Sequence, residues 1–203
     1  YMEFYYPELL PHLSTCKSPQ QMFGAIMKTY YAKKYNIPVD KLAVVSIMPC
    51  VAKKTEITRE GQSAAGVPDV DVVLSTRELA RLIKNQGIDF KGLCDEKFDD
   101  PIGEGSTAGL LFGATGGVME AALRTVSEVV LGKPLDKIDF KAVRGVKGIK
   151  SAKVTLNGQT INVCVASSLS NAKKILEDIK AGKCDYQFIE IMTCPGGCVN
   201  GGG

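Results

Sequence analysis

Leu42-Ala-Val-Val-Ser-Ile-Met-Pro-Cys50 is the stretch that most clearly indicates the fold. Its first part, residues 42–48, is apolar apart from one serine, which is typical of a strand buried in a parallel sheet. A second buried strand is predicted at residues 186–192, and Cys194 follows it. Ligands of open α/β sheets bind beyond the carboxyl ends of strands. The sequence therefore predicts that both cysteines stand where such a sheet binds its ligand.

Extended and helical patterns alternate along the rest of the chain. Ser18 and Pro19 are a good N-cap and first residue for a helix, and Ser75-Thr-Arg-Glu78 is a capping-box pattern. Strands followed by helices favour an α/β class with mostly parallel sheets and flanking helices. The remaining expected elements are an apolar helix face formed by Met22, Phe23, Ile26, Met27, Tyr30 and Tyr31, a charged loop over 53–68, a strand at 70–74, a helix from Ser75 to about Gln86, an irregular stretch at 87–105, a helix at 118–130 stopped by Gly132-Lys-Pro134, strands at 152–156 and 160–166 around the hairpin signal Asn157-Gly158, and a helix at 170–181.

The composition is that of an ordinary globular protein. The 203 residues are 45% hydrophobic and 23% charged with a net charge of +3, which suits one domain or two small lobes. We expect no nucleic-acid partner, because the basic residues form no stripe, and no membrane span, because no run of eighteen apolar residues occurs. No signal peptide is visible, and because the sequence begins at Tyr1 a true N-terminus is expected to be missing.

Seven cysteines stand in a chain too long to resemble a small disulfide scaffold. Cys164 lies in an apolar run and is predicted to be a small buried hydrophobic residue. Cys194-Pro-Gly-Gly-Cys198 predicts a tight loop whose small residues let the backbone approach an iron–sulfur cluster, and thiolates are the usual ligands of such clusters. From the residues alone, a glycine-rich turn with incidental cysteines is an equal alternative. A structural zinc site would need two further ligands at zinc-like spacing, and the sequence does not offer them. Cys16, Cys94 and Cys184 receive no role, and His12 is expected to cap a turn or face solvent.

Two longer motifs resemble those of the iron-only (di-iron) hydrogenases. One is Met48-Pro-Cys-Val-Ala-Lys-Lys-Thr-Glu56 and the other runs from Glu190 through Met192, Cys194, Gly197 and Cys198 to Gly201-Gly-Gly203. Phe112-Gly-Ala-Thr-Gly-Gly-Val-Met-Glu-Ala-Ala-Leu-Arg124 and Ser18-Pro-Gln-Gln21 also look like segments of this family, so the resemblance spans essentially the whole chain.

The resemblance implies reversible conversion of two protons and two electrons into dihydrogen at an H-cluster, a 4Fe–4S cubane joined through a cysteine sulfur to a di-iron subsite with CO and cyanide ligands and a bridging dithiolate amine. It implies that Cys50, Cys194 and Cys198 bind the cubane and that Cys198 also bridges to the di-iron subsite. Lys53 matches the lysine that binds a cyanide ligand, and Ser14 matches a serine of the proton path. The residues that would line the di-iron pocket are Pro19, Gln20, Met48, Phe112 and Met192. Glu56 and Glu190 are expected to make structural hydrogen bonds.

The same resemblance implies the iron hydrogenase large-subunit fold, with two lobes around a central cluster cleft. The family motif Thr-Ser-Cys-Cys-Pro-x-Trp, which supplies the fourth cubane ligand, is absent, so residues 1–203 are expected to be a partial H-cluster domain, truncated at both ends and with no other domain. Such a chain is expected to be inactive alone and to lack a normal H-cluster.

Ferredoxin or a similar electron carrier is the expected partner besides dihydrogen and protons, and the cytoplasm of an anaerobic microbe is the expected location. Three alternatives remain: a non-catalytic iron–sulfur assembly relative, a sensory relative, and a generic α/β module with zinc or no metal. The assembly relatives generally lack the Lys53-type donor and the methionines, which argues against them.

Overall fold

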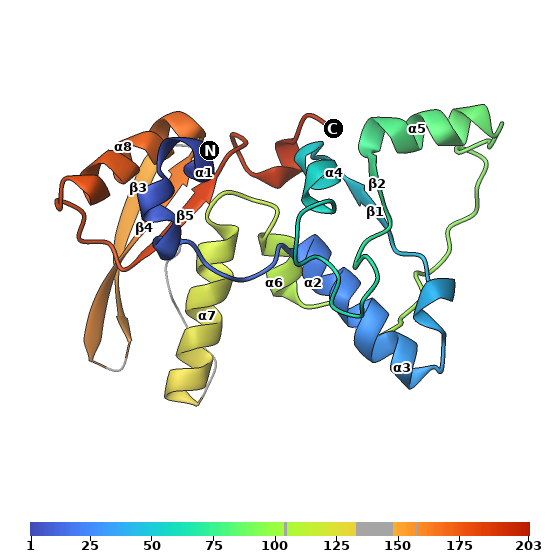
Figure 1. Cartoon of the computed structure of the whole chain (residues 1–203), viewed down its shortest axis with the longest axis horizontal. Helices are drawn as coiled ribbons and strands as arrows, with labels where there is room; N and C mark the ends of the chain where they lie inside the picture. Colours follow the sequence, from blue (N-terminus) through green and yellow to red (C-terminus); the bar gives the residue numbers. More distant parts are fainter. Residues whose placement is uncertain (104, 133–147, 157) are drawn as a thin grey trace. The chain divides into compact units, whose positions relative to one another are not determined.

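The computed structural model describes residues 1–103, 105–132, 148–156 and 158–203. Asn157 of the predicted hairpin turn, together with Lys133 and Pro134 of the predicted helix stop, lies outside the described residues. The chain forms two compact units, one of Tyr1–Glu104 with Gly202–Gly203 and one of Gly105–Gly201 (Figure 1). The two units agree in number with the two predicted lobes.

The first unit begins with helices. After α1 (Met2–Tyr5) and a 3₁₀ turn (Pro7–His12), α2 (Pro19–Ile26) continues through a π-helical turn (Met27–Tyr31) into α3 (Ala32–Lys34). Ser18 is the N-cap of α2, with extended backbone, and Pro19 opens the helix. The predicted start of this helix is therefore confirmed, and His12 is exposed as expected.

The predicted apolar face of this helical segment is largely exposed. Met22, Phe23 and Ile26 are 40–46% exposed, whereas the buried positions are Gln20, Gln21, Gly24, Lys28 and Ala32. A Cβ on Gly24 would stand 2.5 Å from the carbonyl oxygen of Asp69. Helix α2 therefore contacts the backbone at Asp69 through a residue that has no side chain. Lys28 donates to the carbonyl of Leu42 and pairs with Asp71 at 2.9 Å. Close backbone approach and the ion pair of the buried Lys28 select this face, and the apolar side chains do not.

Two parallel strands follow, β1 (Val45–Met48) and β2 (Val72–Ser75), paired in register from Val45 with Val72 to Met48 with Ser75. The first strand begins three residues later than the sequence suggests, and the second begins two residues later. The predicted burial of the first strand is wrong, because Val45 and Ile47 are 53% and 48% exposed. The predicted charged loop contains a short helix, α4 (Ala52–Glu56). Helix α5 (Thr76–Asn85) starts directly after β2 with the predicted capping box, in which Ser75 and Glu78 satisfy each other's backbone N–H groups.

Glu78 also pairs with Lys54 of α4. This lysine and the Ser75 N–H lower the pKa of the Glu78 carboxyl to about 2. A depressed pKa means that the contribution of Glu78 to stability is present above its ordinary pKa and is lost as the pH falls toward about 2.

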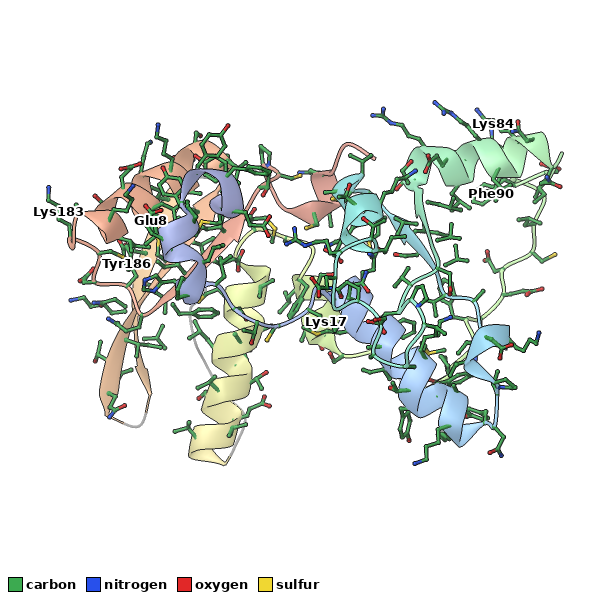
Figure 2. The ribbon with its side chains drawn as sticks, viewed as in Figure 1. Glu8, Lys17, Lys84, Phe90, Lys183 and Tyr186 are labelled. Atoms are coloured by element: carbon green, nitrogen blue, oxygen red, sulfur yellow. The ribbon has the colours of Figure 1, made fainter. Side chains whose placement is uncertain are left out.

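We expect a carboxyl NMR titration to give Glu78 a pKa far below those of the other glutamates. Lys54→Ala should raise the pKa of Glu78 toward its ordinary value, because the hydrogen bond from Lys54 is the largest cause of the lowered pKa. Lys84→Ala, at the far end of α5 (Figure 2), removes the same charge without touching Glu78 and should leave the pKa of Glu78 nearly unchanged. An ordinary pKa for Glu78 in the unsubstituted chain would contradict the Lys54 contact.

The second unit holds a three-stranded sheet in the order β3-β4-β5. Its strands are β3 (Ile149–Leu156), β4 (Gln159–Ser167) and β5 (Phe188–Met192), with β3 antiparallel and β5 parallel to β4. Two of the three strand pairings in the described residues are thus parallel, which confirms the mostly parallel α/β class.

Helices cover both faces of β4. The helices of this unit are α6 (Thr107–Leu111), α7 (Gly117–Leu131) and α8 (Leu169–Lys180), and a 3₁₀ turn (Cys198–Asn200) follows β5. Met119 of α7 packs with Val163 and Val165, whereas Ile175 of α8 packs with Cys164 and Ala166. Side chains alternate along a strand, so the two helices lie on opposite faces. This double burial explains the unbroken apolar run.

Two details of this unit match the sequence expectations. Gly132 ends α7 with a φ of 65°, as the predicted stop requires. Cys164 is fully buried, and burial raises its pKa to about 11, so it is an inert core residue as expected. No helix in the described ranges is long and apolar enough to cross a membrane.

Candidate functional site

Cys50 stands just beyond the carboxyl end of β1, as predicted. Its thiol is partly buried, and its carbonyl accepts the N–H of Lys53 at 3.4 Å, which begins the turn into α4. Gly203 belongs to the same unit and donates its N–H to the carbonyl of Pro49 at 3.3 Å. A Cβ on Gly203 would lie 2.8 Å from the Cys50 nitrogen. The final glycine of the second motif therefore packs directly on the cysteine backbone of the first motif.

A group of polar residues next to Cys50, called the Glu56 cluster below, consists of Ser18, Gln20, Ser46, Lys53 and Glu56. Lys53 Nζ and Ser18 Oγ donate to one carboxylate, that of Glu56, and Gln20 Nε2 approaches it at 3.4 Å. Gln20 Oε1 accepts the hydroxyl of Ser46 at 2.7 Å. The cluster thus joins the start of α2, strand β1 and helix α4. It brings together Gln20 and Lys53, two of the predicted site residues.

An open pocket of about 470 Å³ lies beside this cluster. Its lining residues are Cys16, Lys17, Ser18, Ala52, Thr55, Glu56, Arg59 and Gln62. Lys17, labelled in Figure 2, donates to Gln62 at 3.0 Å and pairs with the fully buried Asp69 at 3.1 Å, so it holds the segment before α2 against the loop after α4.

The remaining predicted residues of the first unit are less enclosed. Met48 is partly buried and Pro19 is exposed. Ser14 is exposed, and its Oγ accepts the Cys16 N–H at 3.2 Å, as expected of a turn-capping serine.

In the second unit, the loop Cys194-Pro-Gly-Gly-Cys198 follows β5. Gly196 and Gly197 have φ values of 85° and 110°, a region that only glycine adopts without strain. A Cβ on Gly197 would stand 2.3 Å from the carbonyl oxygen of Gly113 and 2.7 Å from the Cα of Ala114. Glycine is therefore required here both by conformation and by contact.

The segment between α6 and α7 holds this loop from both sides. Thr115 donates its N–H to Gly196 at 3.2 Å, and Val199 donates its N–H to Gly113 at 3.1 Å. Phe112, which directly precedes this segment, is partly buried. The hydroxyl of Thr115 is buried and has no hydrogen-bond partner in the described residues. Sequence reasoning noticed the glycines of this segment but missed its hydrogen bonds to the cysteine loop.

Cys198 and Met192 are in direct contact. Cys198 Sγ lies 3.6 Å from Met192 Sδ, and Met192 is 8% exposed. The thiol of Cys194 is partly buried and that of Cys198 is exposed. This unit thus brings Cys198 next to the methionine that was expected to pack at the di-iron subsite.

Glu190 fixes the approach to this loop. Its carboxylate is 7% exposed and accepts the N–H groups of Gly116 and Met119, both at 2.7 Å, at the amino end of α7. Burial raises the pKa of Glu190, and the N–H groups of residues 116, 118 and 119 oppose that rise. Negative charge is favourable at a helix amino terminus, so Glu190 links β5 to the segment that holds the cysteine loop. This agrees with the structural role expected for it.

The residue types fit an iron–sulfur cluster. All seven cysteines, which lie in the described ranges, are thiols outside any disulfide, and the glycines leave backbone where a bulky cluster would need space. Cys50 belongs to the first unit, whereas Cys194 and Cys198 belong to the second. Within the described residues, no group of three or more His, Cys, Asp or Glu side chains is arranged to hold a single metal ion.

Comparison with known proteins gives a consistent result. Residues 1–202 match the family described as iron only hydrogenase large subunit, C-terminal domain. The chain is 53% identical over 203 residues to the periplasmic [Fe] hydrogenase large subunit of Nitratidesulfovibrio vulgaris, covering 100% of this chain and 48% of that protein. It is 33% identical to the protein NAR1 of Arabidopsis thaliana, covering 96% of this chain and 44% of that one.

A solved structure of the [FeFe]-hydrogenase HydA(deltaEFG), described as revealing stepwise H-cluster assembly, matches with a TM-score of 0.81 and 39% identity over 100% of this chain and 58% of that one. The chain thus spans less than half the length of the two curated relatives. The cysteines of both motifs lie within the matched residues. The chain belongs to the iron-only hydrogenase large subunit family and corresponds to its C-terminal domain.

Proposed function

We propose that this chain is part of an iron-only hydrogenase and that the protein containing it interconverts dihydrogen with two protons and two electrons at an H-cluster. The observation that carries this proposal is the cysteine loop after β5, held on both sides by the Gly113–Gly117 segment and with Cys198 against Met192. Membership of the hydrogenase family supports it. So does the likeness to the solved hydrogenase structure that revealed stepwise H-cluster assembly.

Within this proposal, Cys50, Cys194 and Cys198 would hold the cubane as thiolates, and Cys198 would also hold the di-iron subsite. Thiolates are the ligands that such clusters require. When bound, the H-cluster supplies the redox and bond-forming chemistry. Because a cubane takes four cysteine ligands and these are three, we propose that a further cysteine comes from outside residues 1–203 and that the chain alone is inactive.

The other proposed roles follow from the chemistry of each side chain. The Lys53 ammonium supplies charged N–H donors to a cyanide ligand, which suits an anion in a dry pocket. Met48 and Met192 keep water away with soft apolar side chains. Ser14 uses its Oγ to accept the Cys16 N–H, which leaves the hydroxyl hydrogen available to pass a proton on. Pro19, Gln20 and Phe112 complete the proposed pocket wall.

A chimera would test the proposal. Residues 1–203 would replace the matching segment of the Nitratidesulfovibrio relative, and the chimera would be produced together with the hydrogenase assembly proteins. We expect infrared bands of bound CO and cyanide and evolution of dihydrogen from reduced methyl viologen. Cys198→Ser should abolish both, because a serine hydroxyl is a poor substitute for a bridging thiolate. Cys184→Ser, which changes a cysteine outside both motifs, should retain them.

The main alternative is a non-catalytic iron–sulfur role, because the chain is also 33% identical to NAR1. A chimera that binds a 4Fe–4S cluster but shows no CO or cyanide bands and no dihydrogen would favour that alternative. The 53% identity to a hydrogenase favours the catalytic function.

Two further proposals concern the electron carrier that serves the protein and the cell compartment in which it works. We propose ferredoxin or a similar one-electron carrier, and the cytoplasm. The Nitratidesulfovibrio relative is named a periplasmic protein, so the compartment needs its own test. Comparing reduced ferredoxin with methyl viologen as electron donor to the chimera would test the first proposal. Immunodetection of the native protein in separated cell fractions would test the second.

A further inference from the structure

The carboxylate of Glu56 collects more donors than a helix salt bridge would explain. Lys53 lies one turn before it on α4, but Ser18 is the N-cap of a different helix and Gln20 is in the first turn of that helix. A carboxylate has about four acceptor positions, and Glu56 uses them to connect two helices.

The partial burial of this pair also separates it from an ordinary surface pair. The side chains of Lys53 and Glu56 are each 22% exposed, against 40% and 37% for Lys54 and Glu78. Exposed ion pairs contribute little to stability, because ordering two long side chains costs entropy and water weakens their attraction. Ser18 donates a hydrogen bond to Glu56, so the position of the Glu56 carboxylate does not depend on its ion pair with Lys53.

The orientation of Gln20 depends on the same carboxylate. Its amide oxygen accepts from Ser46 at 2.7 Å, and its amide nitrogen faces Glu56 and the Lys53 carbonyl, both at 3.4 Å. Gln20 is 5% exposed, so a reversed amide would turn its oxygen toward the carboxylate and leave buried groups mismatched. The Lys53 ammonium has three N–H donors, and the one directed to Glu56 leaves two for a ligand.

We propose that Glu56 is a positioning residue that holds the Lys53 ammonium and the Gln20 amide toward the cyanide-bearing part of the H-cluster. This inference rests on the proposed function. Its physical content is that Glu56 fixes one N–H of a flexible lysine, so that the remaining donors point in a constant direction. Without Glu56 the lysine would sample several rotamers, and the cyanide would meet a weaker and more variable donor.

The first arm of the test uses the 203-residue chain and does not need a cluster. Limited acetylation followed by mass spectrometry would measure the reaction rate of each lysine. Lys53 should react slowly in the unsubstituted chain and about 3- to 10-fold faster in Glu56→Gln, which corresponds to the loss of one partly buried ion pair. The matched control is Glu78→Gln, which should accelerate Lys54 and leave Lys53 unchanged.

Glu56→Asp is a second variant, in case the glutamine variant folds poorly. It keeps the charge but withdraws the carboxylate by one methylene, so it should accelerate Lys53 to an intermediate extent. Unchanged rates at Lys28, which is buried in the same unit, would report that the fold is intact. An unchanged Lys53 rate in both Glu56 variants would overturn the proposal.

The second arm uses the matured chimera and its infrared spectrum. We expect Glu56→Gln to shift and broaden a cyanide band, whereas Glu78→Gln leaves every band in place. Cyanide bands identical to those of the unsubstituted chimera would overturn the positioning role, even if the labelling arm succeeds. Absence of cyanide bands from the unsubstituted chimera would instead refute the proposed function and, with it, the ligand assigned to Lys53.

Discussion

Gly197→Ala is expected to displace the cysteine loop and to destabilise the second unit by about 3 kcal/mol. Gly197 has a φ of 110°, which strains any residue with a Cβ. The added methyl would also stand 2.3 Å from the Gly113 carbonyl oxygen. Both contacting atoms, that oxygen and the Cα of Ala114, belong to the backbone, so the clash cannot be relieved by rotating a side chain.

Urea unfolding of the 203-residue chain, followed by circular dichroism, would measure this loss as a lower midpoint. Gly202→Ala is the matched control, because nothing lies within 4 Å of its added Cβ, and its midpoint should stay close to that of the unsubstituted chain. In the chimera, Gly197→Ala should also lower the bound iron, because Cys194 and Cys198 flank the displaced glycine. Equal midpoints for the two alanine variants would show that the loop is not held by the Gly113–Gly117 segment.

Glu190→Ala is expected to have the largest effect on stability of the changes considered, at about 4 kcal/mol, since two buried N–H groups lose their acceptor at about 1–3 kcal/mol each. These are the N–H groups of Gly116 and Met119, at the amino end of α7. Glu190→Gln should cost roughly half as much, because its amide oxygen can serve one of them while its NH₂ group faces the other.

The same urea measurement would check both variants. Glu128→Ala, an exposed glutamate on the same helix, is the control and should change the free energy of unfolding by less than about 0.5 kcal/mol. Crosslinking of Cys194 to Cys198 by a short bis-maleimide should also become less uniform in Glu190→Ala, because the segment that holds their loop loses its anchor. A midpoint for Glu190→Ala near that of the control would contradict the anchoring role.

The contribution of Glu190 to stability changes with pH in the opposite direction to that of Glu78. Burial raises the pKa of Glu190, so the folded state holds the proton more tightly than the unfolded state does. Its contribution to stability is therefore complete below the ordinary pKa and is lost as the pH rises through the raised value. Relative to Glu190→Gln, the unsubstituted chain should lose stability as the pH rises through this window.

Much of the local structure could be predicted because it depends on residues close together in the sequence. The capping box of Ser75 and Glu78 involves positions three apart, and both its hydrogen bonds form as expected. The apolar run around Cys164 predicted that this cysteine is buried, and α7 and α8 cover the two faces of its strand β4. The family motifs also located the candidate site residues, although the shared ligation of Cys50, Cys194 and Cys198 stays a prediction.

The features that sequence reasoning missed involve residues far apart in the chain. The apolar pattern of α2 did not indicate which of its faces is buried, because the contact of Gly24 with Asp69 and the pairing of Lys28 with Asp71 bridge more than forty residues. The approach of Ser18 and Gln20 to Glu56 has the same origin, because both lie at the start of a different helix far away in the sequence.

The sequence by itself determined the α/β class, the capped helix starts, the cysteines beyond two strand ends and the glycines of the cysteine loop. Only the tertiary structure decided which helix face is buried, which donors of α2 reach Glu56 and which N–H groups donate to Glu190. The physical reason is that periodicity and capping act over one or two turns of chain. Packing faces and buried hydrogen-bond partners are instead set by the approach of backbone segments that only the complete fold brings together.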